Sequence, residues 1–412
     1  MIDTTQKTLL EIVRFQLFGG EKPQVDNNLT AAIMDEARAQ TVTLTVFPFL
    51  SDKLKKHCPE KFARANEMFY SNVMLNTNNF LEHDELHKLM TGNNVPYSAI
   101  KGLASAYYYP EPALRNMGDV DFLVNQPYFE KAKQAVLSAG FQIDHGEDDD
   151  DLHIAFKREP LSVWEQHRTV NGMPGGEAGV LISREIAKTV ETSVTVTLDG
   201  ATCKIPDTLH HGLIMLLHMI AHMTSEGIGL RHLCDWAVFA ESLDSSEFAA
   251  VFEAKLKSFG LWKFAQIMTL TSEKYLGISK KDWAHGCSAD GELLEDVISD
   301  ILSGGNFGKK DLNRYREIKY ISNRGERTVD SKGMVSQVLS TLNQKVRKDH
   351  KVIGKYTALL PLGWVAEGGK YVGYLVSGRR KNTDTSKMLA EASKRKSIYS
   401  KMELFIGTDG RE

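Results

Sequence analysis

The stretch Arg115-Asn116-Met117-Gly118-Asp119-Val120-Asp121-Phe122-Leu123-Val124 decides the fold of this chain. It places two acidic residues one position apart at the start of an apolar run. Successive side chains of a β-strand alternate between its two faces, so Asp119 and Asp121 share one face while the apolar side chains share the other. The stretch therefore predicts a strand with one buried side and one acidic side.

Two carboxylates on one rigid edge form a site for a divalent cation. Mg²⁺ and Mn²⁺ prefer oxygen ligands, and a carboxylate pair at this spacing can hold two ions about 3.5 to 4 Å apart, as nucleotidyl transfer requires. The alternative is a polar loop that leads into a buried strand, because many Asp-x-Asp pairs bind no metal. The pair by itself leaves both interpretations open.

A second polar feature, Lys101-Gly102, precedes Asp119 by 18 residues. Residues 95–100 are predicted to form a short strand that leads into it, and residues 103–107 suit a helix. A strand followed by a glycine and a helix start presents free backbone N–H groups to an anion. Most Lys-Gly pairs are simple turns, but next to the two acids this one predicts a cradle for a triphosphate.

A third polar feature lies in residues 161–167, which are predicted to form a strand. Val163, Glu165 and His167 share one face of it. Glu165 and His167 are therefore expected to point into one cleft, although an exposed strand face would give the same pattern.

These stretches resemble the signature of the bacterial uncharacterised nucleotidyltransferases, a family of the polymerase-beta superfamily. The resemblance covers residues 1 to about 240, and it is specific around residues 101–167. It is carried by Lys101-Gly102, Tyr109-Pro110, Arg115, Gly118 to Val124, Ala139-Gly140-Phe141 and Val163 to His167. It implies an α/β (α+β) fold, with a polymerase-beta-like nucleotidyltransferase core and a mixed sheet, flanked by N- and C-terminal helical regions.

The resemblance also implies an enzyme that moves NMP from an NTP to a hydroxyl, amine or phosphate of a small-molecule or protein acceptor, with Mg²⁺ or Mn²⁺ as cofactor. Asp119 and Asp121 would be catalytic metal ligands. Glu165 would be the third carboxylate, either as a metal ligand or as the base that accepts the proton of an acceptor hydroxyl. The nucleotide and its phosphates would be held by Lys101, Gly102, Arg115 and Gly118.

One position departs from the wider superfamily, which usually has Ser or Thr directly after the phosphate-loop glycine. Here that residue is Leu103, so the hydroxyl that grips a phosphate is missing. Either neighbouring groups compensate, or use of the nucleotide donor is altered or lost. The departure motivates an alternative function, a non-catalytic nucleotide-binding module of a regulatory or antitoxin-like kind.

Four regions are predicted along the chain. They are a helical N-terminal region (1–92), the catalytic domain (93–205), a helical substrate-binding region (206–300) and a basic, mostly helical C-terminal region (301–412). Apolar spacing predicts helices at residues 9–17, 31–39, 62–75, 80–90, 127–139 and 385–403. A hairpin over residues 192–205, turning at Asp199-Gly200, is expected to close the sheet.

A histidine-rich helix is predicted over residues 207–223, with Asp207 as its cap. Three of its histidines form one stripe: His211, His218 and His222. The spacing of the last two is compatible with zinc, but the glutamate of the protease motif is absent, so the stripe is predicted to line the cleft. Arg231 and Asp235 on the next helix are predicted to contact nucleotide or acceptor.

The composition, with 42% hydrophobic and 25% charged residues, is that of a soluble globular protein. Its four cysteines are scattered, which argues against a disulfide framework and for a reducing compartment. The start lacks a basic segment followed by an apolar stretch, and no run of 18 or more apolar residues occurs. We therefore expect a cytoplasmic protein without a transmembrane segment.

Charge is distributed unevenly along the chain. Residues 309–412 contain 23 basic and 11 acidic residues, and the preceding residues contain 27 basic and 42 acidic ones. A basic tail can bind nucleic acid or another acidic partner, or two parts of one molecule can attract each other. Because the basic residues are spread out, nucleic acid is not the favoured partner. Template-independent extension of nucleic acid remains a third hypothesis.

Overall fold

The structure is a computed structural model that describes residues 2–144, 152–308, 310 and 385–406. The chain divides into two compact units. One consists of residues 1–223, 227–311 and 400–412, and the other of residues 224–226 and 312–399. Both sheets and the site described below lie in the first unit.

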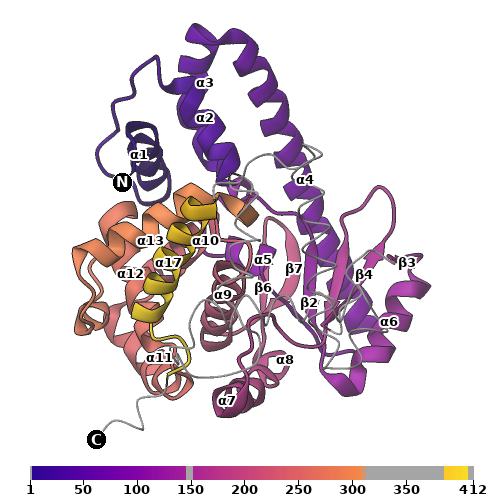
Figure 1. The fold of residues 1–412 in the computed structure, drawn as a ribbon. Coiled ribbons are helices and arrows are strands. Elements are labelled where there is room, and N and C mark those ends of the chain that lie inside the picture. The colour runs from indigo at the N-terminus through magenta and orange to yellow at the C-terminus, as the bar shows by residue number, and fades with distance from the viewer. Residues whose placement is uncertain (1, 145–151, 309, 311–384, 407–412) are drawn as a thin grey trace, which may run out of the picture. The chain divides into compact units, whose positions relative to one another are not determined.

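The N-terminal region is helical, as the apolar spacing predicts (Figure 1). Its helices are α1 (Thr4–Phe18), α2 (Thr30–Ala39), α3 (Thr43–His57) and α4 (Pro59–Gly92). Two details of the prediction were wrong. Helix α3, which contains Pro48, was not predicted, and the helices expected at 62–75 and 80–90 are one continuous helix of 34 residues.

A mixed five-stranded sheet forms the centre of the first unit. Its strands are β1 (Ser98–Ala99), β2 (Val120–Leu123), β3 (Gln142–Ile143), β4 (His153–Lys157) and β5 (Trp164–His167), in the order β1-β2-β5-β4-β3. Only β2 and β5 run parallel, and the other neighbours are antiparallel. The connections contain α5 (Gly102–Ala106), the 3₁₀ turns η1 (Pro112–Leu114) and η2 (Gln126–Tyr128), and α6 (Phe129–Ser138). The helix predicted at residues 127–139 corresponds to η2 and α6, which connect β2 to β3.

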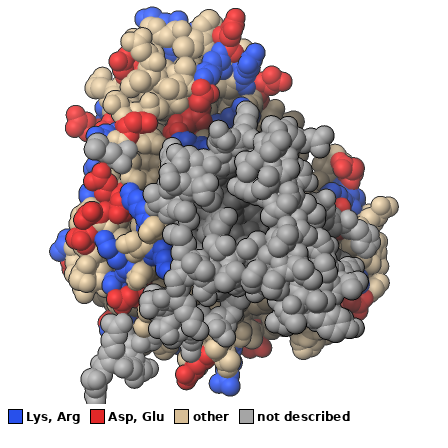
Figure 2. Space-filling view, in the orientation of Figure 1, with Lys and Arg blue, Asp and Glu red and all other residues tan. Residues whose placement is uncertain are grey.

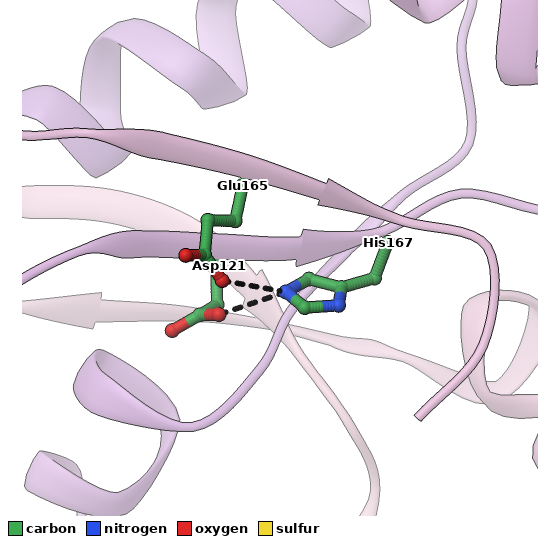
Figure 3. A group of neighbouring side chains, drawn as sticks. All are labelled: Asp121, Glu165 and His167. Carbon is green, nitrogen blue, oxygen red and sulfur yellow. Dashed lines mark hydrogen bonds and ion pairs between the residues drawn. The ribbon is translucent and has the colours of Figure 1, made fainter. Parts of the chain in front are cut away.

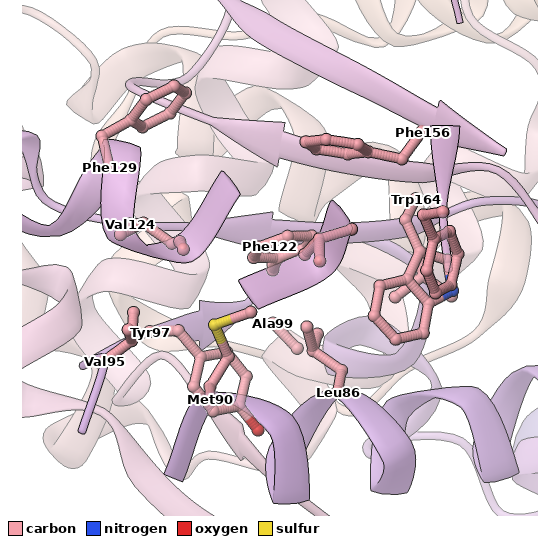
Figure 4. Packing of buried hydrophobic residues seen from close by; sticks show 14 residues of the cluster. Leu86, Met90, Val95, Tyr97, Ala99, Phe122, Val124, Phe129, Phe156 and Trp164 are labelled. Atoms are coloured by element: carbon pink, nitrogen blue, oxygen red, sulfur yellow. The ribbon is translucent and has the colours of Figure 1, made fainter. Parts of the chain in front are cut away.

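One face of this sheet is covered by α4 and α6 and forms a hydrophobic core (Figure 4). The core contains Leu86 and Met90 of α4, Val120 and Phe122 of β2, Phe129, Ala132 and Val136 of α6, Phe156 of β4 and Trp164 of β5. Burial of each large side chain stabilises the fold by roughly 1.5 to 3 kcal/mol. The face of β2 and β5 that carries their polar side chains is therefore the one left for a site.

A separate hairpin consists of β6 (Val194–Leu198) and β7 (Ala201–Ile205), and it follows α7 (Gly176–Ile186) and α8 (Thr189–Thr192). The hairpin turns at Asp199 and Gly200, as predicted, and both residues have positive φ. The hairpin does not close the five-stranded sheet but forms a two-stranded sheet of its own, which corrects the prediction. The buried side chains of β7 instead pack against Phe80 of α4 and Leu103 of α5.

The rest of the first unit is mostly helical. It contains α9 (Thr208–Met223), α10 (Leu230–Glu241), α11 (Ser245–Phe259), α12 (Trp262–Leu276), η3 (Asp282–Gly286), α13 (Gly291–Gly304) and η4 (Asn306–Gly308). The predicted cap of α9 is confirmed, because the backbone N–H of His210 donates to Asp207 Oδ1 over 2.9 Å. The predicted terminal helix is α17 (Thr385–Lys401). Residues 311–384 and 407–412 of the basic region lie outside the described residues.

Within the described ranges, no helix combines the length and the apolar character needed to cross a membrane. On the face seen in Figure 2, acidic and basic side chains of the described residues are interspersed.

Candidate active site

The pairing of β2 with β5 brings the predicted polar residues of two strands together. The parallel register sets Asp121 opposite Glu165 and Leu123 opposite His167. Because side chains alternate along each strand, Trp164 and Gln166 point into the core while Glu165 and His167 point to the other side, as predicted. The amide Nε2 of Gln166 donates to the carbonyl of Phe129 over 2.7 Å, which fixes the core side of β5.

Asp121, Glu165 and His167 form a compact group of possible metal ligands (Figure 3). One ligand atom from each lies within 4.8 Å of the others. The Nε2 atom of His167 is 2.8 Å from Asp121 Oδ1 and 3.3 Å from Glu165 Oε2. Two carboxylates and an imidazole suit a divalent cation, which requires anionic oxygen ligands and tolerates a neutral nitrogen ligand.

Lys101 places its ammonium group against the same carboxylates. Its Nζ atom is 2.7 Å from Asp121 Oδ1 and 3.8 Å from Glu165 Oε2. Burial alone would lower the pKa of Lys101, but the charges of Asp121 and Glu165 outweigh it and raise that pKa. Burial in turn opposes ionisation of Asp121, yet Lys101 and His167 hold the pKa of its carboxyl well below the usual range. The Asp121 carboxyl is thus ionised, and the ammonium group of Lys101 balances its charge.

The backbone of Lys101 is strained. Its φ of 56° and ψ of −114° lie in a region that a residue with a side chain adopts at a cost of about 1 to 3 kcal/mol. This conformation ends the segment after β1 and starts α5 at Gly102. Strain of this kind persists where the surrounding contacts hold it, here the ion pair with Asp121.

Asp119 lies directly before β2 at the edge of this group. Its side chain reaches solvent, and it does not belong to the compact ligand group found among the described residues. Neighbouring protein atoms still restrict its hydration, and with the negative charges of Asp121 and Glu165 they raise the pKa of Asp119 to about 6. The Asp119 carboxylate is therefore poorly stabilised in the absence of a further cation.

Two other predicted residues, Arg115 and Asp235, bind each other. Arg115 Nε donates to Asp235 Oδ1 over 2.8 Å, and Arg115 Nη2 donates to Oδ2 over 2.7 Å. Tyr109 donates its hydroxyl to the same carboxylate over 2.7 Å. Burial opposes the charge of Asp235, but Arg115 lowers its pKa. This buried network joins the segment before β2 to α10, and the phosphate-binding role of Arg115 remains a prediction.

The predicted histidine stripe separates into two places. The ring of His211 stacks on Tyr108, with centroids 5.0 Å apart. His218 and His222 instead lie with His232 of α10, at centroid separations of 4.4 to 5.9 Å. Burial lowers the pKa of His222 to about 4, and the positive charge of Lys101 adds to this effect, so this cluster lies near the acidic group.

The sequence prediction missed several residues that position the site. On α4, Asn76 donates from Nδ2 to the carbonyls of Ala113 and Arg115 over 2.6 and 2.7 Å, and it accepts from the N–H of Met117 over 3.2 Å. Glu82, also on α4, accepts hydrogen bonds from Ser162 and from Trp164 Nε1. Helix α4 therefore holds the approach to both strands of the site, and no motif in its sequence indicated this.

Leu103 has a structural role at the position where the superfamily usually has a hydroxyl. Its side chain is fully buried and packs with Phe80 and with Cys203 and Ile205 of β7. Gly102 and Gly118 are the two glycines predicted to contact the nucleotide. Gly118 directly precedes Asp119 in the sequence, and a Cβ on Gly102 would be 3.7 Å from the Asp119 carbonyl oxygen.

Comparison with known proteins gives one family. The family model described as "Uncharacterised nucleotidyltransferase" matches residues 30–277, which include every site residue named above. No curated protein matches the chain.

Proposed function

The chain belongs to the uncharacterised nucleotidyltransferase family, and from this premise we propose that it transfers NMP from an NTP to a hydroxyl, amine or phosphate of an acceptor. The observation that supports this proposal most directly is the register of the parallel strands β2 and β5. It sets Asp121 opposite Glu165 on the polar face of the sheet, inside the segment that the family model matches.

The ligand chemistry fits a divalent cation, Mg²⁺ or Mn²⁺, as the cofactor. Asp121, Glu165 and His167 already lie within 4.8 Å of one another, and Asp119 adds a carboxylate at the edge. The raised pKa of Asp119, about 6, is what carboxylates in need of a further cation exhibit. A bound ion would orient the nucleotide phosphates and neutralise charge as pyrophosphate leaves.

The residues of the chain supply the remaining chemistry. Lys101, held 2.7 Å from Asp121, can turn its ammonium toward a phosphate when other cations neutralise the carboxylates. Glu165 is proposed to accept the proton of an acceptor hydroxyl. The acceptor oxygen then forms a bond to the α-phosphorus, the bond between that phosphorus and the bridging oxygen breaks, and pyrophosphate leaves with the electron pair.

The non-catalytic module remains the alternative, but Leu103 no longer favours it strongly. The side chain of residue 103 points into a hydrophobic cluster with Phe80 and Ile205, so a hydroxyl at this position would be buried there. The substitution therefore belongs to the packing of α5 against the hairpin. It does not by itself remove a group from the acidic face.

The test combines transfer with binding. Wild-type protein is incubated in cell extract with each NTP and Mg²⁺ or Mn²⁺, while pyrophosphate release and NMP-sized mass shifts of extract components are measured. Asp119→Asn should lower transfer by at least about 100-fold, because it removes a carboxylate from the proposed metal site. Because the side chain of Asp119 is exposed, this variant should fold like the wild type, and Asp121→Asn should have a still larger effect on transfer.

The control is Glu130→Gln, which removes an exposed acid of α6, the helix that packs on the opposite, hydrophobic face of the sheet. It should transfer like the wild type. Unchanged transfer in Asp119→Asn and in Asp121→Asn would contradict the metal site. Metal-dependent NTP binding without any transfer would instead favour the regulatory module.

A further inference from the structure

Arg231, the second residue of α10, is a partly buried cation that has no anionic partner among the residues that the structure describes. Its Nη1 atom donates to the carbonyl of Asn116 over 3.1 Å. Its Nε atom is buried and has no hydrogen-bond partner, and within the described ranges no carboxylate lies within ion-pair distance of its guanidinium. A guanidinium removed from water without a carboxylate is unfavourable, so an anion is needed to complete its surroundings.

The nearest acids do not fill this need. Asp235 is already bound in bidentate fashion by Arg115. Asp119 attracts Arg231 only at a distance greater than that of an ion pair, and it also lies within reach of the charges of Asp121 and Glu165. Burial and the nearby Arg115 lower the pKa of Arg231, which reflects a cation in surroundings that do not yet stabilise it.

Three imidazoles accompany Arg231. His232 follows it on α10, and His222 and His218 approach from α9, with ring centroids 5.9 and 5.6 Å from that of His232. Burial, followed by the charge of Arg231, lowers the pKa of His232. A neutral imidazole carries one N–H that can donate to an oxyanion. The Nδ1 atom of His218 is buried and has no hydrogen-bond partner among the described residues.

Three neighbouring histidines can also bind a metal ion, but the charges around His218, His222 and His232 disfavour one. In the described part of the chain, the only ligand atoms that converge are those of Asp121, Glu165 and His167. The charges of Lys101 and Arg231 act on these imidazoles, as the lowered pKa of His222 reflects. Positive charges repel a dication and attract an anion.

We propose that Arg231, together with His222 and His232, binds a phosphate group of a substrate. The residues of this subsite belong to α9 and α10, whereas Lys101 and Gly102 belong to the start of α5. Two phosphates could occupy it, one from the triphosphate of the NTP and one carried by the acceptor. The identification of these two phosphates rests on the proposed function. Binding of a phosphate group at Arg231 does not, because binding does not require nucleotidyl transfer.

The experiment is calorimetric titration of the full chain with inorganic phosphate, pyrophosphate and tripolyphosphate. Arg231→Gln should weaken binding of the best of these probes at least about tenfold, because a charge-assisted hydrogen bond is lost. Arg231→Lys should bind with intermediate affinity. The control Arg184→Gln removes an exposed arginine of α7 and should bind like the wild type.

Thermal unfolding separates this role from a structural one. Removal of a buried cation without an acidic partner should leave the melting temperature of Arg231→Gln equal to or above that of the wild type. Equal oxyanion affinity in Arg231→Gln and wild type would overturn the proposal. So would the absence of any binding by the wild type.

The two sources are distinguished by competition. Displacement of tripolyphosphate by a non-hydrolysable NTP supports the proposal and identifies the triphosphate as the source. Binding of phosphate to protein saturated with that NTP also supports it and identifies an anionic acceptor. Oxyanion binding that survives in Asp121→Asn, in a chain that shows no transfer in any extract, would contradict the proposed function and leave the subsite intact.

Discussion

Gly102 is a residue whose identity the fold does not require. A Cβ added there would lie 3.7 Å from the Asp119 carbonyl oxygen and 4.0 Å from Arg115 Nη1, which are ordinary contacts. Its φ is also outside the left-handed region that favours glycine. If phosphates approach the start of α5, the methyl group of Gly102→Ala would meet them.

Gly102→Ala is therefore expected to fold with a free energy of unfolding within about 0.5 kcal/mol of the wild type. Its KM for the NTP should rise about tenfold or more, because close approach of the backbone to the ligand is lost. Denaturant unfolding and transfer kinetics test the two parts of this prediction. Gly92→Ala, at a site with nothing within 4 Å, is the matched control, and an equal KM in both variants would refute the role of Gly102.

For single residues, the alternation of side chains along a strand correctly predicted which residues share a face. Contacts between residues far apart in the sequence could not be predicted. Glu165 and His167 share a face because they are two residues apart on one strand, which the sequence displays directly. The partnership of Arg115 with Asp235 joins residues 120 positions apart, and it depends on how α10 packs. Arg231 was noted as a contact residue, but that it lacks an acidic partner is visible only once its neighbours are placed.

Among the elements, α4 determines the geometry of the site most strongly. Asn76 satisfies three backbone groups of the segment that leads into β2, at Ala113, Arg115 and Met117. Backbone groups of a buried segment need such partners, because an unpaired buried group costs about 1 to 3 kcal/mol.

Asn76→Ala is predicted to lower the free energy of unfolding by about 2 to 4 kcal/mol and to lower transfer further than the loss of folded protein explains. Urea unfolding and kinetics of the folded fraction measure both effects. Asn78→Ala, an exposed position on the same helix, should change neither. A loss of stability in Asn78→Ala as large as that in Asn76→Ala would indicate that the substitution acts on α4 itself and not through the hydrogen bonds of Asn76.

The same polar residues explain why α4 was predicted as two helices. Its middle buries Asn76, Asn79, Glu82 and His83, so the apolar spacing that reveals a helix is interrupted where the helix contacts loops and strand ends. Helix α3 was missed for a related reason, since Pro48 lies inside it and usually indicates a boundary. Strands β1, β2 and β5 were predicted because turn residues and alternation around them are local signals, whereas β4 was not predicted.

For the molecule as a whole, buried histidines predict an acid-sensitive fold. Burial lowers the pKa of His83 to about 4 and that of His211 to about 3. An unfolded histidine has a pKa of about 6.5, so below this pH the unfolded state binds protons that the folded state does not. The stability is fully present above pH 6.5 and is lost as the pH falls toward 4.

His83 alone should contribute roughly 3 kcal/mol to this loss of unfolding free energy between about pH 6.5 and 4. Asp119 acts in the opposite direction, because its pKa is raised, but it is a single group. Urea unfolding across this range tests the prediction, with His83→Gln reducing the slope and the exposed His57→Gln leaving it unchanged. A flat profile in the wild type would show that the buried histidines take up protons without unfolding.

The fold class, a mixed sheet flanked by helices, was predicted from the family resemblance and is confirmed. The position of the hairpin was not predicted correctly. Alternation of apolar and polar residues indicates two paired strands, but it does not indicate the surface against which they pack. The side chains of Cys203 and Ile205 pack against α4 and α5, and this preference depends on the shapes of all three elements.

The alternation of side chains along β5 also places a tryptophan next to an acidic residue of the site. Trp164, whose indole lies in the core with its N–H on Glu82, is the immediate neighbour of Glu165 on the polar face. On the opposite wall, Trp236 follows Asp235 and donates its indole N–H to Thr269. The protein thus carries an intrinsic fluorophore beside an acid on each side of its candidate site. Its ultraviolet emission can report ligand binding in solution without any attached dye.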